Sequence, residues 1–150
     1  MKPIDWLSID HFTPDEFADP NYADSGPLIS PLIVYPLNDL RHNTGWPIIT
    51  HAAVGGCVDV DGSHGHAKKS LHLMDQGAMA CDFHFNTDAD PREQYRQVEA
   101  MGFGGVGIYY DWHWDGQLLG IGFHVDQRSV TRLQRWVRRN GEYVYLLGRM

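Results

Sequence analysis

A stretch in the middle of the chain, SLHLMDQGAMACDFHF (residues 70–85), sets histidine and aspartate among apolar residues. Its second half has the two-residue alternation of a β-strand, with Ala78, Ala80 and Asp82 on one face and the bulkier residues 79, 81 and 83 on the other. A carboxylate in such a strand is costly to bury unless a partner neutralises it. Asp82 therefore predicts either a satisfied polar group of the core or a site that faces a cation.

The remaining patterns predict short helices and strands in an irregular order. Apolar positions from 28 to 40 follow a helical stripe that Pro36 interrupts, and a second helix lies between Asp90 and Gly102. Strands are expected over 47–50, 78–85, 104–110, 120–128 and on both sides of a hairpin at Asn140-Gly141, with a long loop over 53–69. These elements predict an α+β fold, a small antiparallel sheet with helices mainly on one side, in one domain spanning 1–150.

Charge and hydropathy limit the classes of partner. The chain carries 12 Lys and Arg against 19 Asp and Glu, a formal net charge of −7, which does not suit nonspecific binding of nucleic acid. Arg132, Arg135, Arg138 and Arg139 form one local cluster, which we interpret as an exposed basic edge. No apolar run has the length of a signal peptide or a bilayer span. We therefore expect synthesis in the cytoplasm, no membrane insertion, and release by another system if the protein acts outside.

The cysteine content gives a further expectation. Cys57 and Cys81 could pair with each other, but two cysteines in 150 residues make no disulfide framework. We expect two separate buried thiols, in keeping with a reducing cytoplasm.

Three residues have the chemistry of a catalytic zinc site. Zinc in enzymes takes three nitrogen or oxygen ligands from the protein and keeps a fourth position for water. His72, Asp82 and His124 supply such a set, and the small alanines beside the acid leave room for an ion. The two-residue strand period also places His124, Asp126 and Arg128 on one face. The sequence thus predicts a zinc ion with an acid and a cation beside it.

The motifs SLH…GAMACD, GFGGVGIY and FHVDQR, with HFTPDEF and LRHNTGWPIITHAAVGG upstream, resemble the zinc D-Ala-D-Ala carboxypeptidases and murein endopeptidases of bacteria and phages. The resemblance extends from about residue 11 to about residue 128, and the combination of motifs carries it. It implies a hedgehog-like peptidase fold, Zn²⁺ as the cofactor and a peptidoglycan peptide as the substrate. By the match, Ser70 is the motif serine, and His72, Asp82 and His124 are the metal ligands.

Three features depart from the family pattern. Nine residues separate His72 from Asp82 where the family has six, a difference that a longer turn can absorb. The segment ITHAAVGG lacks the arginine with which relatives hold their substrate, and Arg128 is our candidate to replace it. Ile121 occupies the position of the glutamate base found in the carboxypeptidase branch.

The implied reaction is zinc-assisted hydrolysis of an amide bond, in which a carboxylate takes a proton from water and passes it to the leaving amine. Asp126 is our first candidate for that carboxylate, and orientation of a ligand histidine is its alternative role. Asp111 and Asp115, in the Trp-rich turn, are further candidates. His113 in the same turn is assigned to stabilise the oxyanion.

Other residues offer competing interpretations. His84 shares a strand face with the predicted metal-binding acid and is a spare ligand candidate. His64 and His66 form a competing metal pair, although their glycine-rich surroundings favour a flexible exposed loop. Trp112 and Trp114 either line a substrate groove or pack in the interior.

Together these features predict a zinc peptidase that hydrolyses peptidoglycan stem peptides or cross-links. Association with a phage or prophage would explain its action on the cell wall after release or delivery by a phage particle. The alternative is a catalytically degenerate structural or binding protein that retains the fold and contacts phage structural proteins. A zinc amidase that cuts the sugar–peptide linkage would use the same ligands and differ in its product.

Overall fold

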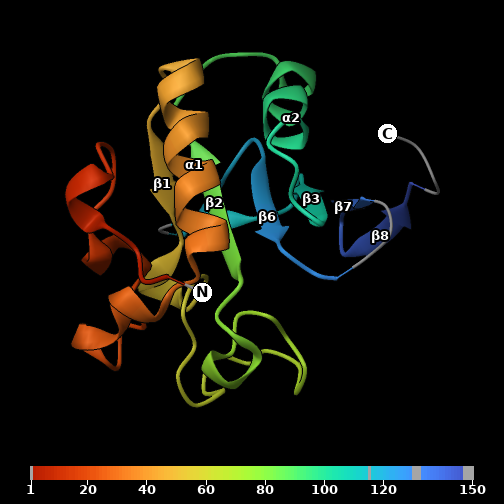
Figure 1. Ribbon diagram of the computed structural model, residues 1–150. Helices are drawn as coiled ribbons and strands as arrows, with labels where there is room; N and C mark the ends of the chain where they lie inside the picture. Colours follow the sequence, from red (N-terminus) through yellow and green to blue (C-terminus); the bar gives the residue numbers. More distant parts are fainter. Residues whose placement is uncertain (1, 115, 130–132, 147–150) are drawn as a thin grey trace.

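The computed structural model describes residues 2–114, 116–129 and 133–146. Within them, two α-helices and a six-stranded sheet form the body of the protein (Figure 1). The helices are α1 (Pro31–Thr44) and α2 (Pro91–Glu99), the strands of the sheet are β1 (Ile48–Thr50), β2 (Ala80–Phe85), β3 (Gly105–Tyr109), β6 (Gly122–Asp126), β7 (Gln134–Arg139) and β8 (Glu142–Tyr145), and β4 (His113–Trp114) and β5 (Gln117–Leu118) form a separate hairpin. Short 3-10 helices at Trp6–Ser8, Pro14–Phe17, Ala23–Leu28, Ala52–Val54 and Met74–Gln76 lie in the connecting segments. The predicted α+β class is confirmed.

The sheet is mixed rather than antiparallel. Its strand order is β1-β2-β6-β3-β7-β8, and every pair of neighbours is antiparallel except β3 and β7, which are parallel. Strand β7 follows β6 in the sequence but lies beyond β3, so it runs alongside β3 instead of pairing with β6. The prediction of a small antiparallel sheet is wrong on this point, because a strand pattern in the sequence does not determine which strand it pairs with or in which direction.

The two faces of the sheet differ in chemistry. Phe83 and Phe123 are fully buried on one face, within a hydrophobic core to which both α-helices contribute. On the other face, β2 and β6 carry Asp82 and His124 as cross-strand partners. The predicted alternation is thus confirmed over β2. Ala78 lies before the strand, with a φ of 48°.

Helix α1 begins and ends at its capping residues. The Ser30 hydroxyl accepts a hydrogen bond from the Leu32 amide at 3.1 Å, and Gly45 ends the helix with a φ of 71°. The helix therefore starts at residue 31 and not at 28. Pro36 has no amide hydrogen for the Leu32 carbonyl, and Gln127 Nε2 donates to that oxygen instead, at 3.1 Å. This bond ties α1 to the segment after β6.

Helix α2 and the last hairpin agree with their sequence signals. Asp90 Oδ1 accepts a hydrogen bond from the Arg92 amide at 2.8 Å, at the start of the helix. Asn140 and Gly141 have φ values of 50° and 79° and join β7 to β8. Among the residues described, no helix combines the length and the hydropathy needed to cross a membrane.

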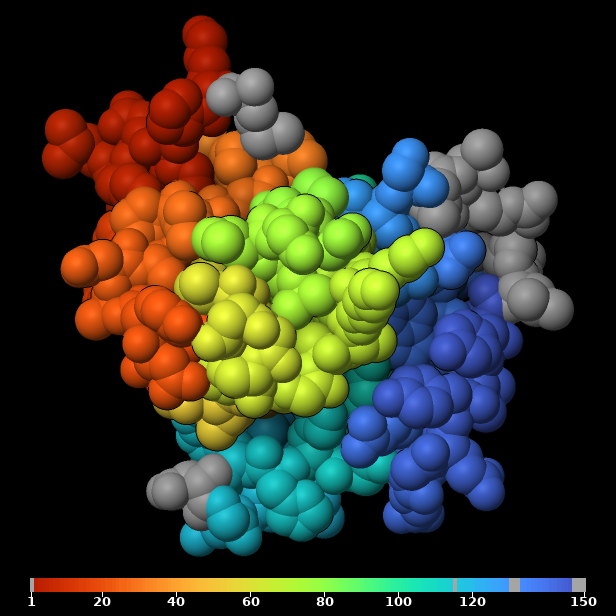
Figure 2. Space-filling view, turned by 90° about the horizontal axis from the view of Figure 1, so that it is seen from below, coloured from red at the N-terminus to blue at the C-terminus, as the bar shows by residue number. Residues whose placement is uncertain are grey.

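The segment between β1 and β2 contains the predicted long loop. This segment lies below the sheet in Figure 1, coloured yellow to green, and it occupies the centre of the view in Figure 2. Its first part is bound to β2, since the Asp82 amide donates to the Gly56 carbonyl at 2.7 Å. Its two halves are joined where the Asp59 amide donates to the His72 carbonyl at 3.0 Å. These bonds bring loop residues to the polar face of β2.

Candidate metal centre

The candidate site begins with side chains on neighbouring strands. Asp82 of β2 lies opposite His124 of β6, and Asp126 lies two residues further along β6, on the same face. Gly105 of β3 is the cross-strand neighbour of Asp126. A Cβ atom at Gly105 would lie 2.5 Å from Asp126 Oδ1. Glycine at this position of β3 therefore makes room for the carboxylate of Asp126 and the guanidinium of Arg128.

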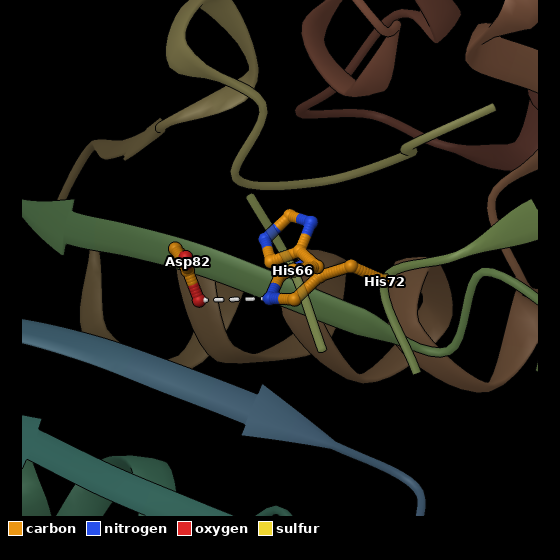
Figure 3. Close-up of side chains that lie close together, drawn as sticks. All are labelled: His66, His72 and Asp82. Atoms are coloured by element: carbon orange, nitrogen blue, oxygen red, sulfur yellow. Dashed lines mark ion pairs between the residues drawn. The ribbon is translucent and has the colours of Figure 1, made fainter. Parts of the chain in front are cut away.

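His72 approaches Asp82 from the loop that precedes β2. Its Nε2 lies 3.3 Å from Asp82 Oδ1 (Figure 3), and the residue is 3% exposed. Its Nδ1 donates to the Cys57 carbonyl oxygen at 3.0 Å. Because a carbonyl can only accept, Nδ1 carries a proton, and Nε2 is the nitrogen that faces Asp82.

His124 reaches the same carboxylate oxygen from β6. Its Nδ1 lies 2.8 Å from Asp82 Oδ1, and its Nε2 lies 2.8 Å from Asp126 Oδ2. Arg128 holds that second acid by two bonds, from Nε to Oδ1 at 2.8 Å and from Nη2 to Oδ2 at 2.7 Å. Asp126 is 1% exposed, so the structure places it where it orients the imidazole of His124.

A third imidazole, from His66, joins the site. Its ring stacks on that of His72 with centroids 4.2 Å apart, and its Nδ1 lies 2.8 Å from Asp59 Oδ2. Ligand atoms of His66, His72 and Asp82 all lie within 4.8 Å of one another (Figure 3). The expectation of a flexible exposed loop is wrong for His66, because the fully buried Asp59 anchors it. Spacing in the sequence carries no signal for this contact, which arises only when the loop folds back on itself.

Electrostatic interactions hold the side chains of this centre together, and they shift the pKa values of Asp82, His124 and Asp126. Burial raises the pKa of Asp82, but the positive charge of His72 and hydrogen bonds from His124 and His72 outweigh burial and hold this pKa well below its ordinary value. Burial lowers the pKa of His124, but hydrogen bonds to Asp126 and Asp82 outweigh burial and raise this pKa to about 9. The pKa of Asp126 is raised by burial and lowered more by Arg128 and His124, so it also lies below its ordinary value. Both acids are therefore ionised at neutral pH.

A second group of potential ligands adjoins the first. Atoms of Asp19, Asp59 and His64 lie within 4.8 Å of one another, and both acids are fully buried. Asp19 accepts a hydrogen bond from the Val60 amide at 2.9 Å and lies 2.8 Å from His64 Nε2. His64 is therefore held in place, which corrects the flexible-loop expectation here as well. Asp59 links the two groups, because its Oδ2 also lies 2.8 Å from His66 Nδ1.

Two other predicted catalytic residues, His113 and Asp111, have no hydrogen bond or ion pair with this centre in the described part of the chain. His113 is exposed on β4, and its assignment to the oxyanion stays a prediction. Asp111 pairs with Arg138 at 3.0 Å, which occupies it in a contact with β7. Asp115 lies outside the described residues. The Ser70 hydroxyl accepts a hydrogen bond from the amide of the histidine two residues on, at 3.3 Å.

The spare ligand candidate, His84, pairs with another histidine. His51 Nε2 and His84 Nδ1 lie 2.8 Å apart, and both residues are buried. Burial lowers the pKa of His51 to about 4, so its ring is neutral. Trp114 stacks on His51 with centroids 4.7 Å apart, and Trp112 stacks on Tyr109 at 4.1 Å. In the described residues, both tryptophans thus have a packing role.

The cluster interpreted as an exposed basic edge is divided between the two faces of β7. Arg135 is buried and pairs with Glu99 of α2, Nη1 to Oε2, at 2.6 Å. Arg138 lies over the ring of Tyr109, with its guanidinium carbon 5.3 Å from the ring centroid. The exposed-edge interpretation is therefore wrong for Arg135, because strand alternation turns it toward the helices. Arg132 lies outside the described residues.

The residues around Asp82 form a possible metal-binding cluster, in which ligand atoms of His66, His72 and Asp82 lie within 4.8 Å of one another. In a tetrahedral zinc site with bonds of about 2.1 Å, neighbouring ligand atoms lie about 3.4 Å apart. The 3.3 Å between His72 Nε2 and Asp82 Oδ1 is close to that separation, whereas the 2.8 Å between His124 Nδ1 and Asp82 Oδ1 is the distance of a hydrogen bond. Imidazole nitrogen and carboxylate oxygen are both ordinary zinc ligands.

Comparisons with known proteins give no assignment. No family model, curated protein or solved structure matched the chain. Function therefore has to be inferred from the residues of the site and their geometry.

Proposed function

We propose that this protein is a zinc-dependent peptidase that hydrolyses amide bonds in peptidoglycan stem peptides or cross-links. The proposal rests on the arrangement around Asp82, where three imidazoles converge and each has one nitrogen held by an acceptor. The acceptors are the Cys57 carbonyl for His72, Asp126 for His124 and Asp59 for His66. Hydrogen bonds of this kind fix the orientation and the tautomer of metal-ligating histidines. The substrate class comes from the resemblance of the motifs to zinc D-Ala-D-Ala carboxypeptidases and murein endopeptidases.

Three residues would hold the ion: His72 through Nε2, Asp82 through Oδ1 and His124 through Nδ1. Bound zinc polarises a carbonyl group and lowers the pKa of water. Asp126 and Arg128 are positioning residues, since Arg128 neutralises and holds the acid that orients His124. We do not favour Arg128 as the residue that binds a substrate carboxylate, because Asp126 and a glutamine of β7 already engage its donors.

His66 is our candidate for the general base. Its Nδ1 bonds to Asp59, which leaves Nε2 free to accept a proton. One of its nitrogens lies within 4.8 Å of atoms of two proposed ligands, close enough to act on water or on the leaving amine. Asp126, the first candidate from the sequence, suits this role less, because it is buried and both of its oxygens are engaged by Arg128.

Metal content and turnover test the two parts of the proposal separately. Protein loaded with zinc and then dialysed is analysed for bound metal, and fragments released from purified peptidoglycan are identified by mass spectrometry. His72→Gln is expected to lose both zinc and turnover, whereas His66→Gln should keep zinc and lose turnover by about 100-fold or more. His42→Gln, which alters an exposed histidine of α1, is the matched control and should keep both. Wild-type protein that binds no zinc, or zinc-loaded protein that releases no fragment from any peptidoglycan tested, would contradict the proposal.

A second candidate function uses the same residues. If His66 joins the other three side chains as a fourth ligand, the ion has no open position and serves a structural role. The grouping of His66 with His72 and Asp82 within 4.8 Å favours this possibility. The protein would then be a structural or binding component of a phage particle that retains the peptidase fold. Loss of zinc from His66→Gln, together with no turnover by the wild type, would support it. The masses of released fragments would separate a peptidase from a sugar–peptide amidase.

A further inference from the structure

Two cysteines lie side by side next to the candidate metal centre. Cys57 Sγ and Cys81 Sγ are 3.3 Å apart, and both side chains are fully buried. Their backbones run next to each other, since the Asp82 amide donates to the Gly56 carbonyl oxygen at 2.7 Å. Both are free, buried thiols, as expected. Their contact was not predicted, and it arises because the loop after β1 returns one cysteine to the strand that carries the other.

We propose that Cys57 and Cys81 are the site of an intramolecular disulfide that forms when the protein meets oxidising surroundings. A disulfide bond is about 2.05 Å long, so the two sulfur atoms need to approach by little more than about 1 Å. Both residues remain free thiols in a reducing cytoplasm. The cross-link would form once the protein leaves that compartment, which is where the proposed function places its substrate.

The cross-link would close the loop that carries two of the imidazoles. Residues 57 to 81 include His66 and His72, and Asp82 follows the second cysteine directly. The Cys57 carbonyl is also the acceptor for His72 Nδ1. Linking Cys57 to β2 would therefore fix that acceptor relative to Asp82. A covalent link across the loop also removes conformations from the unfolded chain, which stabilises the folded protein.

The reaction needs a two-electron oxidant, for which a small disulfide such as oxidised glutathione suffices. One protein thiolate attacks a glutathione sulfur, which forms a mixed disulfide and releases one reduced glutathione. The other thiolate attacks the protein sulfur of that mixed disulfide, forms the bond between the cysteines and releases a second reduced glutathione. Two protein thiols are oxidised, one glutathione disulfide is reduced, and the two thiol protons leave on the glutathione products.

Burial sets the conditions under which the bond forms. Both side chains are fully buried, so an oxidant reaches the sulfur atoms only when the loop opens. A buried thiol with few thiolate ions exchanges slowly. Oxidation is therefore expected during folding or during local opening of the loop, and slowly in the closed native state.

Mass spectrometry of the full chain tests the proposal without any need for metal. Unfolded protein is refolded in EDTA with a mixture of reduced and oxidised glutathione, its free thiols are alkylated, and it is digested with trypsin. Cleavage at Arg41, Lys68, Lys69 and Arg92 places the cysteines in peptides 42–68 and 70–92. We expect an intact mass lower by two hydrogen atoms and a linked pair of these peptides that disappears on reduction. The linked protein should melt about 5–10 °C above the reduced protein.

Two single variants are matched controls. Cys57→Ala and Cys81→Ala each leave one thiol, and neither should change its melting temperature between reducing and oxidising refolding buffers. Two alkylated thiols in the folded wild type at every glutathione ratio, or a linked form that melts below the reduced form, would overturn the proposal.

Zinc retention separates this inference from the proposed function. If the disulfide forms and neither redox form binds zinc, the proposed function fails and the disulfide stands. If zinc binds and no disulfide forms, the disulfide proposal fails and the proposed zinc site stands. If both proposals are right, a chelator should remove zinc more slowly from the linked protein, because the loop that carries His66 and His72 opens less often.

Discussion

Raising the pH from 6 to 8.5 in EDTA is expected to weaken the metal-free fold through His124. Its ring nitrogens lie 2.8 Å from Asp82 and 2.8 Å from Asp126, and these bonds raise its pKa to about 9 against the opposing effect of burial. The unfolded chain has a pKa of about 6.5 at this residue, so the folded protein binds the proton more tightly. The resulting stabilisation is complete below about pH 6.5 and is lost as the pH rises through about 9.

The gap between the two pKa values corresponds to about 3 kcal/mol of unfolding free energy, of which about 2 kcal/mol should be lost by pH 8.5. Urea unfolding at constant ionic strength, followed by circular dichroism, measures this loss. Above about pH 8.5 the thiol of Cys81 ionises in the unfolded chain, so the comparison stops there. His124→Gln lacks the titrating group, and its unfolding free energy should change far less over the same range. A wild-type profile as flat as that of the variant would refute the reasoning.

Three further changes test the core, the sheet and the metal. Phe83→Ala should lower the unfolding free energy by about 3–5 kcal/mol in urea titrations, because the ring is fully buried, and a loss below about 1 kcal/mol would contradict the assigned packing. Gly107→Ala places a Cβ atom 2.3 Å from Trp136 Nε1, so it should cost about 1–3 kcal/mol and change the tryptophan fluorescence; an unaltered spectrum and stability would argue against that contact. Zinc binding at pH 7.5 should release about one proton, because Nδ1 of His124 must lose its proton to act as a ligand. Calorimetry in buffers of different ionisation enthalpy measures the number of protons released. No proton release would exclude His124 as a ligand.

Short-range signals in the sequence predicted most of the regular elements. Asp90 at the start of α2 and the Asn140-Gly141 turn act through hydrogen bonds and backbone angles within a few residues, so they can be read without the fold. The alternation in β2 is equally local. Helix α1 shows the limit of such signals, since a stripe of apolar residues did not locate its first residue and the Ser30 cap did.

The candidate site was predictable in part. His72, Asp82 and His124 were singled out from residue type and motif spacing, and the structure brings both imidazoles to one carboxylate oxygen. His66 and its anchor Asp59 were not recognised as members of this site. Their contact depends on how a glycine-rich loop folds back, and no periodic pattern describes that path.

The sequence by itself determined which residues alternate between the faces of β2 and β6, where α2 begins and where the last hairpin turns. Those features follow from backbone geometry and hydrogen bonds over a few residues. Only the tertiary structure decided that β7 lies parallel to β3, that a third imidazole stacks on His72 and that the two thiols touch. Each of these contacts joins segments whose proximity depends on the packing of the whole chain. Burial of apolar surface is non-directional, so the apolar pattern of a segment does not specify which other segment it packs against.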